Sequence, residues 1–165
     1  MKYIIYFLAI FLLLVIQQGI LMPLGIMPVN LLLVFAVTAM LIADFNTALG
    51  ITLACGVLLD LASGTADGLI TMSLVSALLI LYFLLNSWVS REANRLVLFS
   101  AVAGTTVLYF FLFMVFNRIF AVFNLGQNLQ LNYFFLRILP LSLLFNLIFT
   151  YPIFLYFSYV RSIQN

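Results

Sequence analysis

The chain has 165 residues, of which 67% are hydrophobic and only 6% are charged. Soluble domains carry about 25% charged residues, so this composition excludes a soluble globular domain and predicts an all-α polytopic membrane protein. The formal net charge of +2 is too small and too scattered to indicate a nucleic-acid partner.

Six apolar segments follow one another along the chain, and each approaches the length of about 20 residues that a transmembrane helix needs. Their approximate ranges are 3–21, 29–43, 47–62, 68–89, 96–122 and 133–160. The second and third segments are short, and they fit either two short full spans or a re-entrant pair. Because both readings return the chain to the same side, the topology of the later segments is unaffected. We expect one transmembrane domain over residues 1–165.

The distribution of basic residues predicts the orientation of these segments, because such residues favour the cytoplasmic side of a membrane. With the N-terminus inside, the cytoplasmic group is Lys2, Arg91, Arg95 and Arg161, and the outer group is Arg118 and Arg137. This asymmetry predicts that both termini are cytoplasmic.

The third segment combines small residues with a carboxylate. Its residues Ala48, Thr52, Gly56 and Asp60 recur at a spacing of four and share one helix face, where another helix can approach closely. A carboxylate near the bilayer centre costs about 2.5–3.5 kcal/mol on insertion scales, so we expect a specific role for Asp60. It caps or hydrogen-bonds a neighbouring helix, it serves binding or coupling, or it serves catalysis. The catalytic role lacks a nearby histidine, second helical acid or metal cluster.

The glycine-rich loop from Ser63 to Gly68 follows this segment. Asp67 is well placed to cap the N-terminus of the fourth segment. The successive backbone N–H groups of the loop also offer an anion site, although no lysine or arginine lies beside them.

Two arginines, Arg118 and Arg137, lie near the expected outer ends of the fifth and sixth segments. They either extend toward lipid head groups or form an ion pair with Asp60, since all three residues are expected toward the same side of the bilayer.

A phenylalanine stripe runs along the fifth segment at spacings of three or four residues: Phe110, Phe113, Phe116, Phe120 and Phe123. Such a stripe is typical of core packing or of a lipid-facing surface. The alternative is an aromatic face for a partner helix, for which the candidates are Phe113, Phe116 and Phe120.

The sequence lacks the common catalytic and metal-binding patterns, namely GxSxG, HExxH, Walker A and CxxC. We therefore expect no enzymatic activity, no catalytic residue, no metal site and no cofactor. The single cysteine, Cys55, lies among small apolar residues and is interpreted as a small buried hydrophobic residue.

The segment from Pro28 onward resembles the rod shape-determining protein MreD family. The resemblance rests on a proline-initiated apolar helix and on the pattern G-x5-G-x3-D-x3-G-x3-G, formed by Gly50, Gly56, Asp60, Gly64 and Gly68. Family members often carry a charged residue, frequently arginine, between the second and third helices. This chain has Asp44 and Asn46 there instead.

The resemblance implies a non-enzymatic inner-membrane scaffold of the bacterial cell-elongation machinery, which supports lateral peptidoglycan synthesis. Its implied partner is the bitopic membrane protein MreC, together with RodA, a class B penicillin-binding protein, MreB and the surrounding membrane lipids.

The MreD family is also similar in fold to the substrate-binding S-components of energy-coupling-factor vitamin transporters. The resemblance therefore implies an S-component-like bundle, and such a transporter subunit is the alternative function. S-components dock their partner through small residues spaced by four on the first helix, where this chain offers only Ala9. A lipid-modifying enzyme is a third class, for which the sequence supplies one buried acid and no partner base.

Overall fold

The structure is a computed structural model that describes residues 2–24, 29–64, 68–88, 95–125 and 134–164. Within these ranges the chain is helical and contains no strand. The elements in chain order are α1 (Lys2–Ile16), η1 (Gln17–Leu21), α2 (Leu31–Ile42), α3 (Phe45–Ser63), α4 (Leu69–Trp88), α5 (Arg95–Val122), η2 (Phe134–Ile138) and α7 (Leu139–Gln164). The two η elements are π-helical turns, of which η1 extends α1 and η2 leads into α7.

Within the described residues, five helical stretches are long and apolar enough to cross a membrane. They are Ile4–Leu21, Phe45–Ser63, Leu69–Asn86, Arg95–Val122 and Phe135–Val160. This confirms the expected class, an all-helical membrane protein. The expectation of six comparable spans needs one correction, because α2 has only 12 residues. At a rise of about 1.5 Å per residue α2 is about 18 Å long, well short of a hydrocarbon core of about 30 Å.

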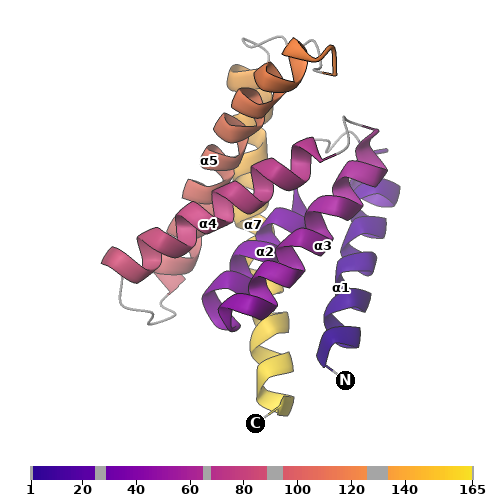
Figure 1. Cartoon of the computed structure of the whole chain (residues 1–165). Coiled ribbons are helices and arrows are strands. Elements are labelled where there is room, and N and C mark those ends of the chain that lie inside the picture. Colours follow the sequence, from indigo (N-terminus) through magenta and orange to yellow (C-terminus); the bar gives the residue numbers. More distant parts are fainter. Residues whose placement is uncertain (1, 25–28, 65–67, 89–94, 126–133, 165) are drawn as a thin grey trace.

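Helix α2 forms the centre of the bundle (Figure 1), and it contacts α1, α3, α4, α5 and α7. Every residue from Leu31 to Met40 is buried. A helix that is apolar on all sides has no polar face to turn toward water, so it is stable when other helices surround it. The shortness of α2 is therefore compatible with its place, since neighbouring helices surround its buried residues.

Aromatic side chains join α2 to the first and last helices. The Phe157 ring of α7 lies 4.6 Å from the Phe35 ring of α2 and 5.6 Å from the Tyr6 ring of α1, measured between ring centroids. Tilted and offset arrangements of this kind are favourable for aromatic pairs. This cluster holds the two chain ends against the central helix.

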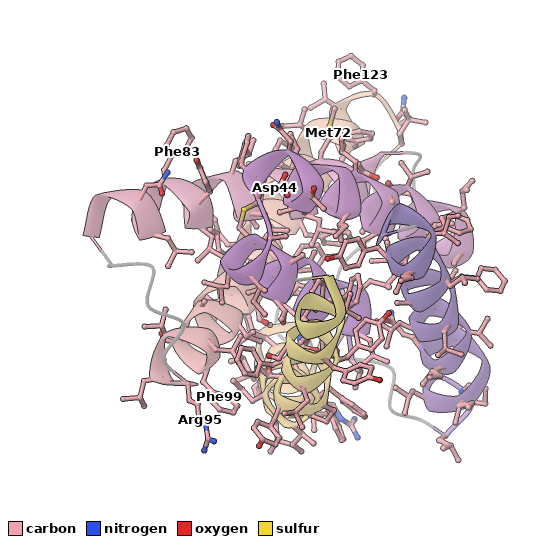
Figure 2. The ribbon with its side chains drawn as sticks, turned by 90° about the horizontal axis from the view of Figure 1, so that it is seen from below. Asp44, Met72, Phe83, Arg95, Phe99 and Phe123 are labelled. Carbon is pink, nitrogen blue, oxygen red and sulfur yellow. The ribbon has the colours of Figure 1, made fainter. Side chains whose placement is uncertain are left out.

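Helix α1 begins and helix α7 ends at the same end of the bundle (Figure 1). The cytoplasmic location of that end stays a prediction. The outer surface is strongly apolar: Met72, Phe83 and Phe123 project outward (Figure 2) and are 51%, 66% and 71% exposed. Apolar side chains exposed in this way suit contact with lipid rather than with water.

Candidate functional site

The segment around Asp60 forms a tight hairpin between the end of α3 and the start of α4. Helix α3 ends at Ser63, and the next residue, Gly64, has a φ of +63°. Gly68, directly before α4, has a φ of +92°. Both values lie in the left-handed region, which glycine adopts without the steric penalty of a Cβ atom. The last two glycines of the predicted motif therefore end one helix and begin the next.

Asp60 lies inside this hairpin and is only 6% exposed. Its Oδ1 atom accepts a hydrogen bond from the Ile70 N–H at 2.8 Å, and its Oδ2 atom accepts one from the Thr71 N–H at 3.0 Å. The Thr71 hydroxyl also donates to Oδ2, at 2.5 Å. The first N–H groups of a helix have no partner within that helix, and the positive end of the helix dipole attracts an anion. Asp60 of α3 therefore caps the N-terminus of α4.

Gly56 lies one turn before Asp60, at a close approach of α3 and α4. A Cβ atom at this position would lie 2.8 Å from the Thr71 Cα atom and 2.9 Å from the Thr71 Oγ1 atom. Such distances are too short for any side chain, so only glycine allows the two backbones to meet here. Thr71 thus lies against Gly56 and is hydrogen-bonded by Asp60, two residues of the predicted α3 stripe.

The other motif residues have different surroundings. Thr52 is fully buried, and its hydroxyl donates to the Ala48 carbonyl oxygen at 2.8 Å. Gly50 is exposed, with no atom of another residue near the position of a Cβ. Pro28 and Asp67 lie outside the described residues, so the expected cap by Asp67 stays a prediction.

The sequence also suggested an ion pair between Asp60 and Arg118 or Arg137. The hydrogen bonds of Asp60 described above come instead from α4. Both Arg118 and Arg137 are exposed, whereas Asp60 is buried and oriented by α4. Exposure suits the alternative, in which the two guanidinium groups extend toward head groups. The ion pair stays a prediction.

The phenylalanine stripe faces the bundle interior along its first half. Phe110 and Phe113 are each 8% exposed, Phe116 and Phe120 are half-buried against the same core, and Phe123 is 71% exposed. The burial of Phe113 favours core packing over the partner face suggested for it. Cys55 is also fully buried.

A second buried polar cluster lies at the N-terminus of α2, and the sequence reasoning missed it. The Asn146 Oδ1 atom of α7 accepts the Asn30 N–H at 3.0 Å, and the Gln17 Oε1 atom of η1 accepts the Leu31 N–H at 2.9 Å. The Asn30 side chain in turn accepts the Leu33 N–H at 3.0 Å. Three neutral amide side chains therefore satisfy three backbone donors at the start of the buried helix.

Asn146 is itself fully buried and held by hydroxyl groups. Its Nδ2 atom donates to the Thr106 hydroxyl of α5 at 3.2 Å and to the Ser142 hydroxyl at 3.4 Å. The signal was present in the sequence, because Ser142, Asn146 and Thr150 recur at a spacing of four inside an apolar segment. The Asp60 stripe has the same spacing, but Ser142, Asn146 and Thr150 are uncharged, so the cost of burying a charge did not single them out.

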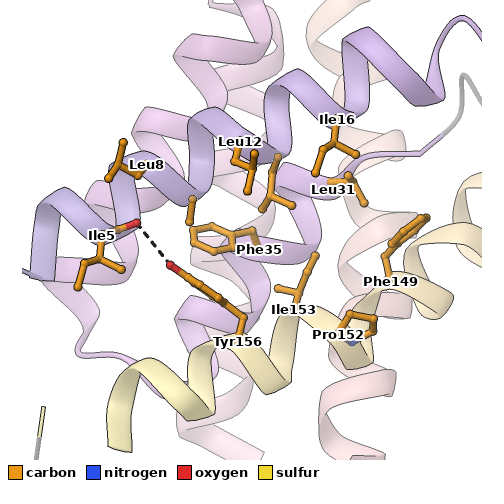
Figure 3. A pocket seen from close by; sticks show the side chains of 12 residues that line it. Ile5, Leu8, Leu12, Ile16, Leu31, Phe35, Phe149, Pro152, Ile153 and Tyr156 are labelled. Carbon is orange, nitrogen blue, oxygen red and sulfur yellow. Dashed lines mark hydrogen bonds between the residues drawn. The ribbon is translucent and has the colours of Figure 1, made fainter. Parts of the chain in front are cut away.

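Two of the hollows in the described part of the bundle lie beside the central helix α2. An apolar groove of about 490 Å³ lies between α1 and α7, and Leu31 and Phe35 of α2 also line it (Figure 3). The Tyr156 hydroxyl donates across it to the Ile5 carbonyl oxygen at 3.5 Å. A smaller pocket of about 280 Å³ lies where α3 ends and α2 and α4 begin. It is lined by Leu59 and Ile70, which flank the hairpin, and by polar residues of η1 and the α2 entry.

Fold and site together define the class of the protein: an all-helical, multi-pass membrane protein with two helix N-termini capped inside the bundle. Comparison of the chain with protein-family models, with curated proteins and with solved structures finds no match. The membership in the MreD family and the S-component-like arrangement therefore stay predictions.

Proposed function

We propose that the chain is a non-enzymatic scaffold of the bacterial inner membrane, which binds a bitopic partner of the MreC type and supports lateral peptidoglycan synthesis. The observation that carries the proposal is that residues of the MreD-like motif build the hairpin between α3 and α4. Gly56 permits close helix approach, Asp60 caps α4, and Gly64 and Gly68 form the ends of the turn. Four residues of the motif thus have roles in building a hairpin.

The hydrogen bonds of the Asp60 carboxylate support a structural rather than a catalytic role. Both of its oxygen atoms accept hydrogen bonds from the backbone of α4. A general acid or base must instead exchange a proton with a substrate within hydrogen-bonding reach. A carboxylate held in this way contributes rigidity to the bundle.

The lipid-facing helices provide surface for partners in the same membrane. Only 22% of the residues in the α1 and α7 spans are buried, against 44% in the α3 and α5 spans. Helices associate in a bilayer through van der Waals packing of such surfaces and through hydrogen bonds between helices. A scaffold built in this way needs no large soluble loop.

Co-purification of the full chain from detergent-solubilised membranes tests the proposal. The bait is the affinity-tagged chain, the expected prey is the MreC-like bitopic protein of the same genome, and an unrelated bitopic protein is the control. We expect selective co-elution of the MreC-like protein and loss of rod shape when the gene is deleted. Absence of co-elution together with normal cell shape after deletion would refute the scaffold.

A thermal-shift measurement with vitamins separates the scaffold from the transporter alternative. A ligand that binds only the folded state raises its stability with ligand concentration. Saturable stabilisation by one vitamin, together with no bitopic partner, would favour the S-component reading. We expect the vitamins to leave the thermal midpoint unchanged.

A further inference from the structure

A further hollow, of about 460 Å³, lies between the first half of α1 and the first half of α3, and we call it the α1–α3 groove. Phe7 and Ile10 of α1 line one side, and Gly50 and Ala54 of α3 line the other. Asp44, directly before α3, lines one end. Residues 44 and 54 are ten positions apart, so the groove runs about 15 Å along α3, which is about half of the hydrocarbon core.

Gly50 gives this groove its depth. The residue is exposed, and among the described residues no atom lies within 4 Å of the position that its Cβ would take. A glycine inside a helix costs about 1 kcal/mol relative to alanine, and no contact within the bundle requires one here. At Gly56, in contrast, the missing Cβ admits Thr71 of α4. The space beside Gly50 is therefore suited to the backbone of a helix from another chain.

A carboxylate marks one end of the groove. Asp44 is exposed (Figure 2), and its side chain is oriented by hydrogen bonds from the Thr47 N–H at 3.0 Å and from the Thr47 hydroxyl at 2.8 Å. It lies at the end of the bundle where α1 begins, which the basic residues of the chain predict to be cytoplasmic. Transmembrane helices carry an excess of lysine and arginine in their cytoplasmic flanks. A helix in the groove would therefore bring a positive charge to Asp44, whereas a lipid would bring its phosphate.

We propose that the α1–α3 groove receives the single transmembrane helix of the bitopic partner, with a lysine or arginine of its cytoplasmic flank facing Asp44. The site rests on the proposed scaffold function and gives that function a location. Gly50 and Ala54 allow the close backbone approach that drives helix association in a bilayer. The charge pair determines orientation, because a helix inserted the other way round would place its basic flank at the opposite end of the bundle.

Site-specific photocross-linking in membranes tests the location directly. Benzoylphenylalanine replaces Phe7, which is 58% exposed and lines the groove, or Phe111 as the control, which is 58% exposed on α5 and does not line it. We expect the MreC-like protein of the same genome to be cross-linked from position 7 and not from position 111. Adducts from position 7 with lipid alone, or with a second copy of the chain alone, would overturn the proposal.

Gly50→Leu fills the groove without a clash inside the chain. Gly104→Leu is the matched control, because Gly104 is also an exposed helical glycine with open space at its Cβ position, but on α5. Both variants should keep or raise the thermal midpoint of the chain alone, since leucine has the better helix propensity. We expect Gly50→Leu to lower co-elution of the MreC-like protein by about tenfold or more, the loss that overpacking of a helix contact causes. Gly104→Leu should leave co-elution unchanged.

Asp44→Asn tests the charge separately from the fold. Asparagine caps a helix about as well as aspartate, so the thermal midpoint should stay near that of the parent chain. We expect the apparent affinity for the MreC-like protein to fall about two- to fivefold, as for an exposed ion pair. Binding by the parent chain should weaken as salt is added, and binding by the variant should weaken less. Equal affinity and equal salt dependence would contradict the basic flank.

The outcomes separate the site from the scaffold function. If the parent chain does not co-elute with the MreC-like protein, the scaffold and its site fail together. If the parent chain co-elutes, Gly50→Leu co-elutes equally well and position 7 gives no cross-link, only the site fails. Cross-linking from position 7 that is lost in Gly50→Leu and retained in Gly104→Leu would support it.

Discussion

The N-termini of α4 and α2 solve the same problem in two different ways. Each places backbone N–H groups inside an apolar bundle, where every such group needs a partner. At α4 one carboxylate, Asp60, accepts two of them from only 10 and 11 residues along the chain. At α2 the caps are neutral, and one comes from Asn146, 116 residues from Asn30.

The difference separates local from long-range stabilisation. A charged cap makes stronger hydrogen bonds and interacts with the helix dipole, but burial of its charge is unfavourable. It therefore ties two consecutive helices into one hairpin at one position. Neutral amides avoid the burial of charge, and because Gln17 and Asn146 come from η1 and α7, they join the first and last helices to the central one.

Removal of the charged cap is expected to have the largest effect on stability. Asp60→Leu leaves the Ile70 and Thr71 N–H groups unpaired, so the free energy of unfolding in detergent should fall by about 2–6 kcal/mol, at about 1–3 kcal/mol for each group. Asp60→Asn retains a carbonyl acceptor and should lose clearly less. Equal stability of Asp60→Leu and the parent chain would contradict the capping role.

Removal of the distant neutral cap comes next. Asn146→Leu leaves the Asn30 N–H unpaired, which corresponds to a loss of about 1–3 kcal/mol in the free energy of unfolding. Thr150→Val is the comparison, since the Thr150 hydroxyl only donates to the carbonyl oxygen of Asn146 in its own helix. If both variants unfold at the same denaturant concentration, the long-range bond contributes nothing measurable.

The close approach of α3 and α4 predicts a contrast between two glycines. Gly56→Ala places a Cβ atom against the backbone of Thr71, and overpacking of this kind destabilises by about 1–3 kcal/mol. Gly50→Ala meets open space, so the better helix propensity of alanine, about 1 kcal/mol, should stabilise α3. Thermal midpoints that shift in the same direction would disprove the contrast.

The smallest expected effect concerns the Thr71 hydroxyl. Thr71→Val removes its hydrogen bond to Asp60 but leaves both backbone donors of the cap in place. Single side-chain hydrogen bonds in membrane bundles average about 0.6 kcal/mol, so unfolding should change by about that amount. A loss as large as that of Asp60→Leu would show that the hydroxyl, and not the backbone, dominates the cap.

Much of the hairpin could be predicted from the sequence, because its determinants are local. Asp60, Gly56 and the two glycines of the turn all lie within one short stretch, and their spacing of four indicates one face and one close contact. The partner of Asp60 was open among several alternatives, since a spacing does not specify which neighbouring group a carboxylate meets. The role of Asn146 was missed because its partner is remote in sequence.

Composition and hydropathy by themselves determined that this chain is an all-helical membrane protein, and the glycine-rich loop predicted a break between the third and fourth segments, close to where α3 ends and α4 begins. Only the tertiary structure decided that the short α2 is the central helix, that Asp60 caps α4, and that Asn146 meets Asn30. The physical reason is that an apolar segment of 12 residues has the same composition whether lipid or protein surrounds it. Packing of the whole bundle distinguishes the two, and it alone brings distant polar groups within hydrogen-bonding distance.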